Sequence, residues 1–184
     1  MNQHDMTRNM VLAALFAALT AIGAFLQIPT GTVPITLQFL FTALAGLLLG
    51  WKWGTVSQLL YVGIGLLGLP VFTQGGGIGY VLQPSFGFLL GLIPAAAVIG
   101  ALTARRTGYL TVLAAVLVGD LILYAVGVPY MYLILHVYIQ SAKTFPALLA
   151  AMLVYVPGDT LKIVVVTALV PVLRRTLAKA VPNL

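Results

Sequence analysis

Long apolar runs dominate this sequence, and only short groups of glycine, proline or charged residues separate them. Hydrophobic residues make up 61% of the chain and charged residues 7%, against about 25% charged residues in a typical soluble domain. A transmembrane helix needs about 20 apolar residues, so a chain of this length has room for about six or seven spans and little else. The sequence therefore predicts an all-α integral membrane protein with a single membrane domain over residues 1–184.

The breaks between the apolar runs divide the chain into six predicted helices. These helices cover residues 8–28, 36–50, 53–69, 85–104, 109–126 and 159–179, to within a few residues. The remaining segment, residues 128–158, is also apolar, but Lys143 and three prolines divide it into pieces of about ten residues, too short to cross a bilayer. The prolines are Pro129, Pro146 and Pro157. We expect this segment to be an irregular connector on the outer side.

The distribution of basic residues predicts how the helices are oriented, because Lys and Arg collect in cytoplasmic loops. Six spans with a cytoplasmic N-terminus place seven of the nine basic residues in the cytoplasm, whereas seven spans would put the cluster LRRTLAK outside. The expected topology is therefore six transmembrane helices with both termini cytoplasmic. The seven residues are Arg8, Lys52, Arg105, Arg106, Arg174, Arg175 and Lys179.

Reactive side chains are too few for most kinds of chemistry. The chain has no cysteine and only three acidic residues, Asp5, Asp120 and Asp159. This set lacks the paired carboxylates of a metal site and of most intramembrane hydrolases and transferases. We therefore expect no enzymatic activity, no bound metal and no cofactor. The net charge of +6 is explained by membrane topology, so we expect no nucleic-acid partner.

Three connectors fall on the outer side in this topology and carry almost no charge. They are PTGTVPIT, the glycine-rich segment PVFTQGGGIGYVLQP, and the end of the long connector at PGD. Irregular backbone at membrane depth is tolerated only where protein buries it or where it lines a cavity. The sequence therefore predicts a ligand pocket near the outer face, roofed by these segments.

Asp159 and Lys162 are charged residues at the start of the last predicted helix, within apolar sequence. They share one helix face because they are three residues apart, and charges at membrane depth are costly enough to mark functional sites. Asp159 is alternatively an N-cap, and the two residues together are alternatively a structural ion pair. The functional interpretation is that they bind a small polar ligand, Asp159 accepting N–H bonds and Lys162 donating to a carbonyl or carboxylate.

Neutral residues of the outer segments are further candidates for contact with this ligand. The glycine-rich loop allows close backbone approach and is either a flexible loop or a lid, and it lacks the pattern of a nucleotide-binding loop. For the polar and aromatic side chains the structural alternatives are helix capping and the interfacial aromatic belt. The candidates are Thr36, Gln38, Gly76, Gly77, Tyr80, Gln83 and Tyr124.

Two further ionisable residues, Asp120 and His136, each have more than one interpretation. Asp120 lies about midway along the fifth predicted helix, where it pairs with Lys162 or caps a kink. His136 has no Cys, Asp or Glu at metal-ligand spacing, which favours a packing or surface histidine over a zinc ligand.

Small residues form a stripe on the first predicted helix, with Ala13, Ala17 and Ala21 at four-residue spacing. Such stripes let two helices approach closely in lipid. The stripe serves either internal packing or docking of a second membrane protein.

Three segments together resemble a known family. VPITLQ, GLPVFTQGGGIGYVLQPSFGFLLG and VPGDTLK are similar, in this order, to signature segments of the BioY family, the biotin-binding S components of energy-coupling factor (ECF) transporters. The resemblance covers roughly residues 13–179. It departs at QPSFGF, where many relatives read more like GPTGGY, so Phe86 and Phe88 alter the contacts expected on that side of the loop.

The resemblance implies a six-helix protein that captures biotin from outside and works with a transmembrane coupling protein and two ATPase subunits. It also implies that Asp159, Lys162 and the glycine-rich loop around residues 75–80 belong to the biotin site, and that the alanine stripe contacts the coupling protein. Two alternatives stay open on the residues alone, an S component for another vitamin and a self-sufficient small-solute carrier. A third, an intramembrane enzyme, is disfavoured by the shortage of acidic residues.

Overall fold

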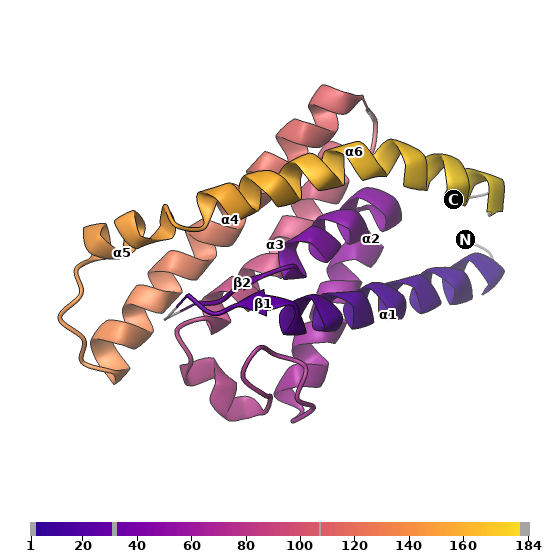
Figure 1. Cartoon of the computed structure of the whole chain (residues 1–184). Helices are drawn as coiled ribbons and strands as arrows, with labels where there is room; N and C mark the ends of the chain where they lie inside the picture. The colour runs from indigo at the N-terminus through magenta and orange to yellow at the C-terminus, as the bar shows by residue number, and fades with distance from the viewer. Residues whose placement is uncertain (1–2, 31–32, 107, 181–184) are drawn as a thin grey trace.

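A computed structural model describes the chain except residues 1–2, 31–32, 107 and 181–184, so the ends of the predicted domain 1–184 lie outside the described residues. Of residues 175 and 177–180 it describes the backbone only. The chain is mainly helical (Figure 1), which confirms the predicted all-α class. The helices are α1 (Gln3–Phe25), α2 (Gln38–Leu66), α3 (Phe86–Leu102), α4 (Tyr109–Leu133), α5 (Phe145–Met152) and α6 (Val156–Ala180).

Shorter elements join the helices at one end of the molecule. Between α1 and α2, the two-residue strands β1 (Gln27–Ile28) and β2 (Ile35–Thr36) pair antiparallel, with Gln27 opposite Thr36. Between α2 and α3 lies the 3₁₀ turn η1 (Ile78–Leu82), and α4 continues into the π-helical turn η2 (Ile134–Tyr138). These elements lie in the segments predicted to be irregular and on the outer side.

Helix α2 reverses direction at Gly50, whose φ of 73° lies in the left-handed region that favours glycine. Two hydrogen bonds join its halves. The Thr42 hydroxyl donates to Gln58 Oε1 at 2.9 Å, and Gln38 Nε2 donates to the Tyr61 hydroxyl at 2.8 Å. From the first bond to the second, the partner in the first half moves back from Thr42 to Gln38, while the partner in the second half moves forward from Gln58 to Tyr61. The two halves therefore run antiparallel, and α2 is a helical hairpin.

The two arms of the α2 hairpin pack closely at their closed end. A Cβ added to Gly54 would lie 2.9 Å from Gly46 Cα, so neither position has room for a side chain. The arms, residues 38–49 and 51–66, correspond to the helices predicted at 36–50 and 53–69. The first arm is only about 18 Å long at 1.5 Å per residue. It is therefore shorter than the thickness of the hydrocarbon core of a bilayer, about 30 Å.

Helix α4 corrects the prediction that the fifth helix ends at residue 126. It continues through Pro129 to Leu133, and η2 extends it to Tyr138. A proline inside a helix removes one N–H and disturbs one carbonyl, and neighbouring groups in membrane helices restore such losses. The connector predicted to be irregular over 128–158 is therefore helical in its first third and again in α5.

Both outer helices begin earlier in the chain than the sequence predicts. Helix α1 starts at Gln3 instead of residue 8 and ends at Phe25, where β1 follows. Helix α6 starts at Val156, three residues before Asp159, with Pro157 in its first turn, where its missing N–H costs nothing.

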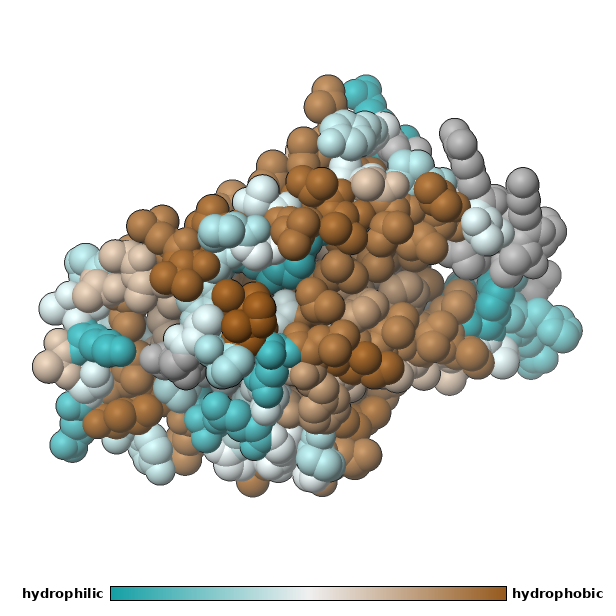
Figure 2. Space-filling view, viewed as in Figure 1, coloured by the Kyte–Doolittle hydropathy of each residue, from teal (hydrophilic) through white to brown (hydrophobic). Residues whose placement is uncertain are grey.

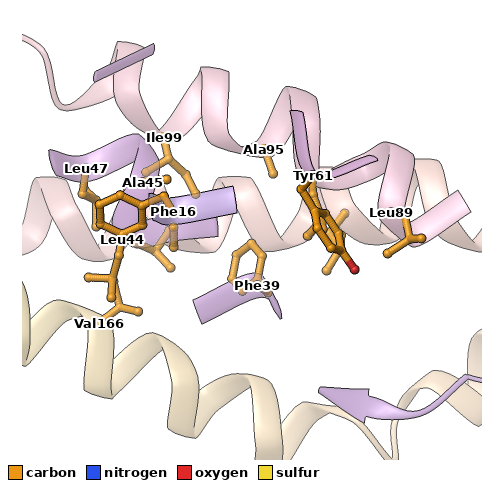
Figure 3. Packing of buried hydrophobic residues seen from close by; sticks show 14 of the residues in the cluster. Phe16, Phe39, Leu44, Ala45, Leu47, Tyr61, Leu89, Ala95, Ile99 and Val166 are labelled. Atoms are coloured by element: carbon orange, nitrogen blue, oxygen red, sulfur yellow. The ribbon is translucent and has the colours of Figure 1, made fainter. Parts of the chain in front are cut away.

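The hydrophobic core lies where α1, the α2 hairpin and α3 meet, with side chains from α4 and α6 closing it. Figure 3 shows these side chains pointing into a common space from separate helices. Close packing in this space positions the start of α2 against α6. Its labelled members include Phe16, Phe39, Tyr61, Ile99 and Val166.

A second apolar cluster lies under the outer segments and fixes the loop between the two strands. Val33 of that loop packs with side chains of α4, η2 and α5. This packing anchors the loop next to the start of α6. The other buried members are Val128, Met131, Leu135, Leu148 and Met152.

The outer surface of the bundle is apolar. In Figure 2, hydrophobic side chains form a broad band over α1 and α6, and hydrophilic side chains gather toward the ends of the molecule. Among the described residues, four helices are long and apolar enough to cross a membrane, α2 counted as one, and α3 is a shorter apolar helix. The start of α1 and the end of α6 lie at the same end (Figure 1), as an even number of crossings requires. The exact number of spans and their sidedness remain predictions.

Candidate ligand-binding site

A cavity of about 60 Å³ lies between β2, the start of α2, α3, α4 and α6. One wall is polar and carries the charged residues of α6, and the opposite wall is apolar. Five of the residues predicted to contact a ligand line this cavity: Thr36, Gln38, Tyr124, Asp159 and Lys162. The other lining residues are Pro34, Ile35, Phe39, Phe88, Leu89, Leu92, Leu123 and Tyr155.

Asp159 and Lys162 form a buried ion pair in the wall of the cavity. Their Oδ1 and Nζ atoms are 2.5 Å apart, and the residues are only 6% and 7% exposed. The pair takes this form because one helical turn separates the residues on a face that α6 turns toward α2 and α4. The structural alternative, an ion pair, is thus present, and any ligand must compete with it or add to it.

Asp159 does not cap α6, which corrects the N-cap alternative. Its backbone N–H donates to the Tyr155 carbonyl at 2.9 Å, one turn back, so Asp159 is already inside the helix. Its carboxylate instead accepts a hydrogen bond from the Tyr124 hydroxyl of α4. This bond joins α4 to α6 at the cavity.

Lys162 joins α6 to the strand segment. Its Nζ atom donates to the backbone carbonyl of Thr36 at 3.3 Å, in addition to its ion pair with Asp159. An ammonium group has three N–H donors, and these two contacts use two of them. One donor therefore remains for a ligand in the cavity.

Thr36 and Gln38 continue the polar wall as a chain of neutral hydrogen bonds. The Thr36 hydroxyl donates to Gln38 Oε1 at 2.9 Å, and Gln38 Nε2 donates to the Tyr61 hydroxyl. Tyr61 in turn donates to the carbonyl of Val71 at 3.1 Å. The side chain of Gln38 is therefore held by the segment that leads into the glycine-rich loop.

Tyr155 is a lining residue that the sequence analysis missed. Its hydroxyl donates to the carbonyl of Val33 and accepts a hydrogen bond from the Thr30 hydroxyl at 3.1 Å. It thereby ties the loop between β1 and β2 to the start of α6 at the edge of the cavity. The only sequence signal was an aromatic residue four positions before Asp159.

Phe88 and Phe86, where the sequence departs from many relatives, lie in different places. The Phe88 ring lines the cavity and meets the Tyr124 ring edge-on, with ring centroids 6.0 Å apart. Phe86 is buried in the core between Tyr80 and Tyr130. The departure therefore changes the cavity wall at Phe88 only.

The glycine-rich loop lies away from the cavity, and none of its four candidates lines it. The N–H of Gly77 donates to the Gly65 carbonyl at 2.7 Å, and a Cβ on Gly76 would lie 2.0 Å from the Leu69 carbonyl oxygen. These glycines serve close backbone packing against the end of α2. Tyr80 is buried and its hydroxyl lies 2.8 Å from that of Thr73, while Gln83 is exposed. Ligand contact by these four residues stays a prediction.

The alanine stripe of α1 faces mainly inward. Ala13 and Ala17 are 1% and 4% exposed and Ala21 is partly buried. This burial favours the internal-packing alternative, because Ala13 and Ala17 are covered by this chain's own core, and docking of a partner by these residues stays a prediction. The exposed alanines of α1 are Ala14 and Ala18.

Neither His136 nor Asp120, whose roles the sequence did not assign, is among the residues that line the cavity. His136 stacks on the Tyr132 ring with centroids 5.3 Å apart, which agrees with a packing role. Asp120 lies on α4 one turn from Tyr124, and its Oδ1 atom is buried without a hydrogen-bond partner in the part of the chain that the structure describes. The sequence analysis allowed an ion pair with Lys162, but Lys162 pairs with Asp159.

Known proteins resemble this chain over most of its length. The BioY family model matches residues 1–179. A probable biotin transporter BioY of Lysinibacillus sphaericus is 52% identical over 79% of this chain and 75% of the relative, and the biotin transporter BioY of Thermotoga maritima is 36% identical over 86% and 90%. A crystal structure of the S-component for biotin from an ECF-type ABC transporter has a TM-score of 0.82 and 30% identity, covering 95% of each chain.

Proposed function

The chain belongs to the BioY family, and we propose that it is the biotin-binding S component of an ECF-type vitamin transporter in the cell membrane. It is a membrane-embedded binding subunit and not an enzyme. The proposed site is the cavity next to Asp159 and Lys162. The observation that carries this proposal is a buried ion pair with unused hydrogen-bonding capacity in the wall of a cavity, because charged residues inside a membrane are costly and usually mark a functional site.

The chemistry of biotin suits the lining of this cavity. Its ureido ring has two N–H donors and a carbonyl, its tail ends in a carboxylate, and the body between them is apolar. The Asp159 carboxylate accepts N–H bonds, Lys162 donates to a carbonyl or carboxylate, and the leucines of α3 and α4 cover the apolar body. Ligand pockets usually combine such an apolar lining with a few placed polar groups.

The cavity has to enlarge to admit the whole vitamin. Its volume of about 60 Å³ is well below the roughly 300–1,000 Å³ of small-molecule pockets. The described residues next to β1 and β2, Thr30 and Val33, are the ones we propose to move, because a hydrogen bond between each of them and Tyr155 holds them at the edge of the cavity. These bonds are few enough to break and re-form as the ligand enters.

Transport requires partners, since the chain carries no nucleotide-binding pattern. The partners we propose are a transmembrane coupling protein and two ATPase subunits. We infer that the coupling protein docks on the exposed face of α1, where Ala14 and Ala18 allow close helix contact. Ala18→Trp should then reduce co-purification with the coupling protein and leave biotin binding intact, whereas loss of biotin binding alone would contradict this placement.

Calorimetry of the purified full chain with biotin, thiamine and riboflavin tests the function. We expect binding of biotin only, and its loss in the double variant Asp159→Asn, Lys162→Met. Lys143→Met is the matched control, because it removes an exposed ammonium of the outer connector. Selective binding of another vitamin would support an S component of different specificity. Unchanged biotin affinity in the double variant would overturn the proposed site.

A self-sufficient carrier is the second candidate, and reconstitution separates it from an S component. Vesicles that contain this chain alone should bind biotin without accumulating it. Uptake that needs no ATPase partner would favour the carrier.

A further inference from the structure

Asp120 is a partly buried carboxylate for which the proposed site has no role so far. Its Oδ1 atom is inaccessible and has no hydrogen-bond partner among the described residues. An unsatisfied polar atom in a protein interior costs about 1–3 kcal/mol, and more when it is charged. Inside a membrane bundle an ionisable residue of this kind indicates function by default.

The geometry of α4 and α6 brings Asp120 to the depth of Lys162. The two helices run in opposite directions (Figure 1) and are joined where Tyr124 donates to Asp159. From that joint, Asp120 lies four residues along α4 and Lys162 three residues along α6, toward the same end of the molecule. At 1.5 Å per residue these displacements are about 6 Å and about 4.5 Å.

The three charged groups do not balance. Lys162 is paired with Asp159, so one ammonium faces two carboxylates, and Asp120 is left over. A ligand N–H group that takes the Oδ1 atom of Asp159 displaces Lys162 from it, while Tyr124 bonds Oδ2. Lys162 would then keep only the neutral Thr36 carbonyl as an acceptor, and a buried ammonium without a counter-charge is strongly unfavourable.

We propose that Asp120 is the second acceptor of Lys162: when ligand N–H donors occupy the Asp159 carboxylate, the Lys162 ammonium turns to the Asp120 carboxylate. This inference rests on the proposed function, because it assigns a positioning residue to the same site. Asp120 does not touch the ligand in this arrangement. It keeps Lys162 charged, paired and oriented while Asp159 is in use.

The competing explanation is that Asp120 is a neutral, protonated side chain with no part in binding. Asparagine has nearly the same shape as a protonated aspartate, so Asp120→Asn distinguishes the two. A neutral Asp120 predicts unchanged biotin affinity in this variant. A second acceptor predicts weaker binding by about tenfold to a hundredfold, as for a lost hydrogen bond to a charged group.

A double-mutant cycle shows whether the effect passes through Lys162. Biotin affinity is measured by calorimetry for the full chain, Asp120→Asn, Lys162→Met and the double variant. In the Lys162→Met background we expect Asp120→Asn to change the residual affinity by less than about twofold, because the coupling partner is gone. An equal loss in both backgrounds, or no loss in either, overturns the proposal. If the parent chain does not bind biotin, the proposed function itself fails.

A second measurement leaves Asp120 unaltered and is decisive if Asp120→Asn does not fold. The chain has only three acidic side chains, and Asp5→Asn removes the one near the N-terminus. Infrared difference spectra on addition of biotin amide, which has no carboxylate, should then show two perturbed aspartate groups. A change confined to one aspartate overturns the proposal.

Discussion

Two buried polar clusters in this bundle differ in composition and in how fully they are satisfied. The neutral cluster joins α1 to both arms of α2 and consists of Thr20, Thr42, Ser57 and Gln58, all fully buried. The charged cluster joins α4 to α6 and consists of Asp120, Tyr124, Asp159 and Lys162. The first lies inside packed helices, whereas three members of the second, Tyr124, Asp159 and Lys162, line the cavity.

The neutral cluster uses its hydrogen bonds within itself. Gln58 Oε1 accepts from Thr42, and Gln58 Nε2 donates to Ser57 at 2.9 Å and to Thr20 at 3.3 Å. The Thr20 and Ser57 hydroxyls also donate to carbonyls of their own helices, and the Thr42 hydroxyl shares its one proton between Gln58 and the Gln38 carbonyl. Polar side chains of this kind hold helices together where lipid gives no hydrophobic driving force.

The charged cluster leaves some of its hydrogen-bond donors and acceptors without partners among the described residues. Asp120 has a buried oxygen without a partner in the described part of the chain, and Lys162 has a donor beyond its two contacts. The comparison teaches that burial of polar groups does not by itself indicate a binding site. Unsatisfied capacity next to a cavity is what separates the proposed ligand-binding cluster from the neutral, structural one.

The largest expected effect follows from removing one member of the charged pair. Lys162→Met or Asp159→Asn leaves the partner charge unpaired and should weaken biotin binding by roughly 30-fold or more. Calorimetry of the purified chain measures this. The control on the same helix is Val164→Ala, which faces lipid and should bind like the parent. If Lys162→Met and Asp159→Asn both bind biotin as tightly as the parent, the charged cluster does not differ from the neutral cluster in ligand binding.

The neutral cluster should respond in stability and not in affinity. Gln58→Met strands its three partners and should lower the free energy of unfolding by about 1–3 kcal/mol, while biotin affinity changes by less than about twofold. Thermal unfolding in nanodiscs and calorimetry measure the two effects. Gln83→Met is the control, since Gln83 is exposed. A loss of affinity at unchanged stability would contradict the structural role.

Gln38 tests the boundary between the clusters, because it lines the cavity and is held by Tyr61. Gln38→Met should reduce biotin affinity by about fivefold to tenfold, the value of one neutral hydrogen bond. Tyr61→Phe should have a smaller effect in the same direction, since it only frees the amide to rotate. If Tyr61→Phe weakens binding more than Gln38→Met, then Tyr61 does not act on biotin through Gln38.

The smallest effect is expected at Tyr155, which holds the loop at the cavity edge. Tyr155→Phe removes the hydroxyl that forms hydrogen bonds with Val33 and Thr30 and should speed biotin dissociation by about threefold, because only part of these two bonds is lost in the step that releases biotin. Release of labelled biotin measures this rate. Tyr138→Phe, on an exposed residue, is the matched control. An unchanged dissociation rate would show that the loop is held by the packing of Val33 instead.

Composition and charge patterning were sufficient to predict the class of fold and the pair of residues that lines the cavity. The rule that charges are costly in lipid acts on each residue alone, so Asp159 and Lys162 stand out without knowledge of their neighbours. The hairpin at Gly50 was likewise visible, because Gly and charge interrupt the apolar run there.

Other features depended on contacts that local sequence does not encode. Whether α4 continues past Pro129 depends on what packs around it, and whether Ala13 and Ala17 face a partner or the core depends on the rotation of α1. Tyr155 lines the cavity only because the loop between β1 and β2 folds onto it.

The sequence by itself determined that this chain is helical, lies in a membrane and carries a charged pair in an apolar setting, because these properties follow from the solvation of single residues and from periodicity. Only the tertiary structure decided which polar groups satisfy one another and which are left with spare hydrogen bonds beside a cavity. That outcome depends on the relative positions of α2, α4 and α6, which are set by packing between segments far apart in the chain.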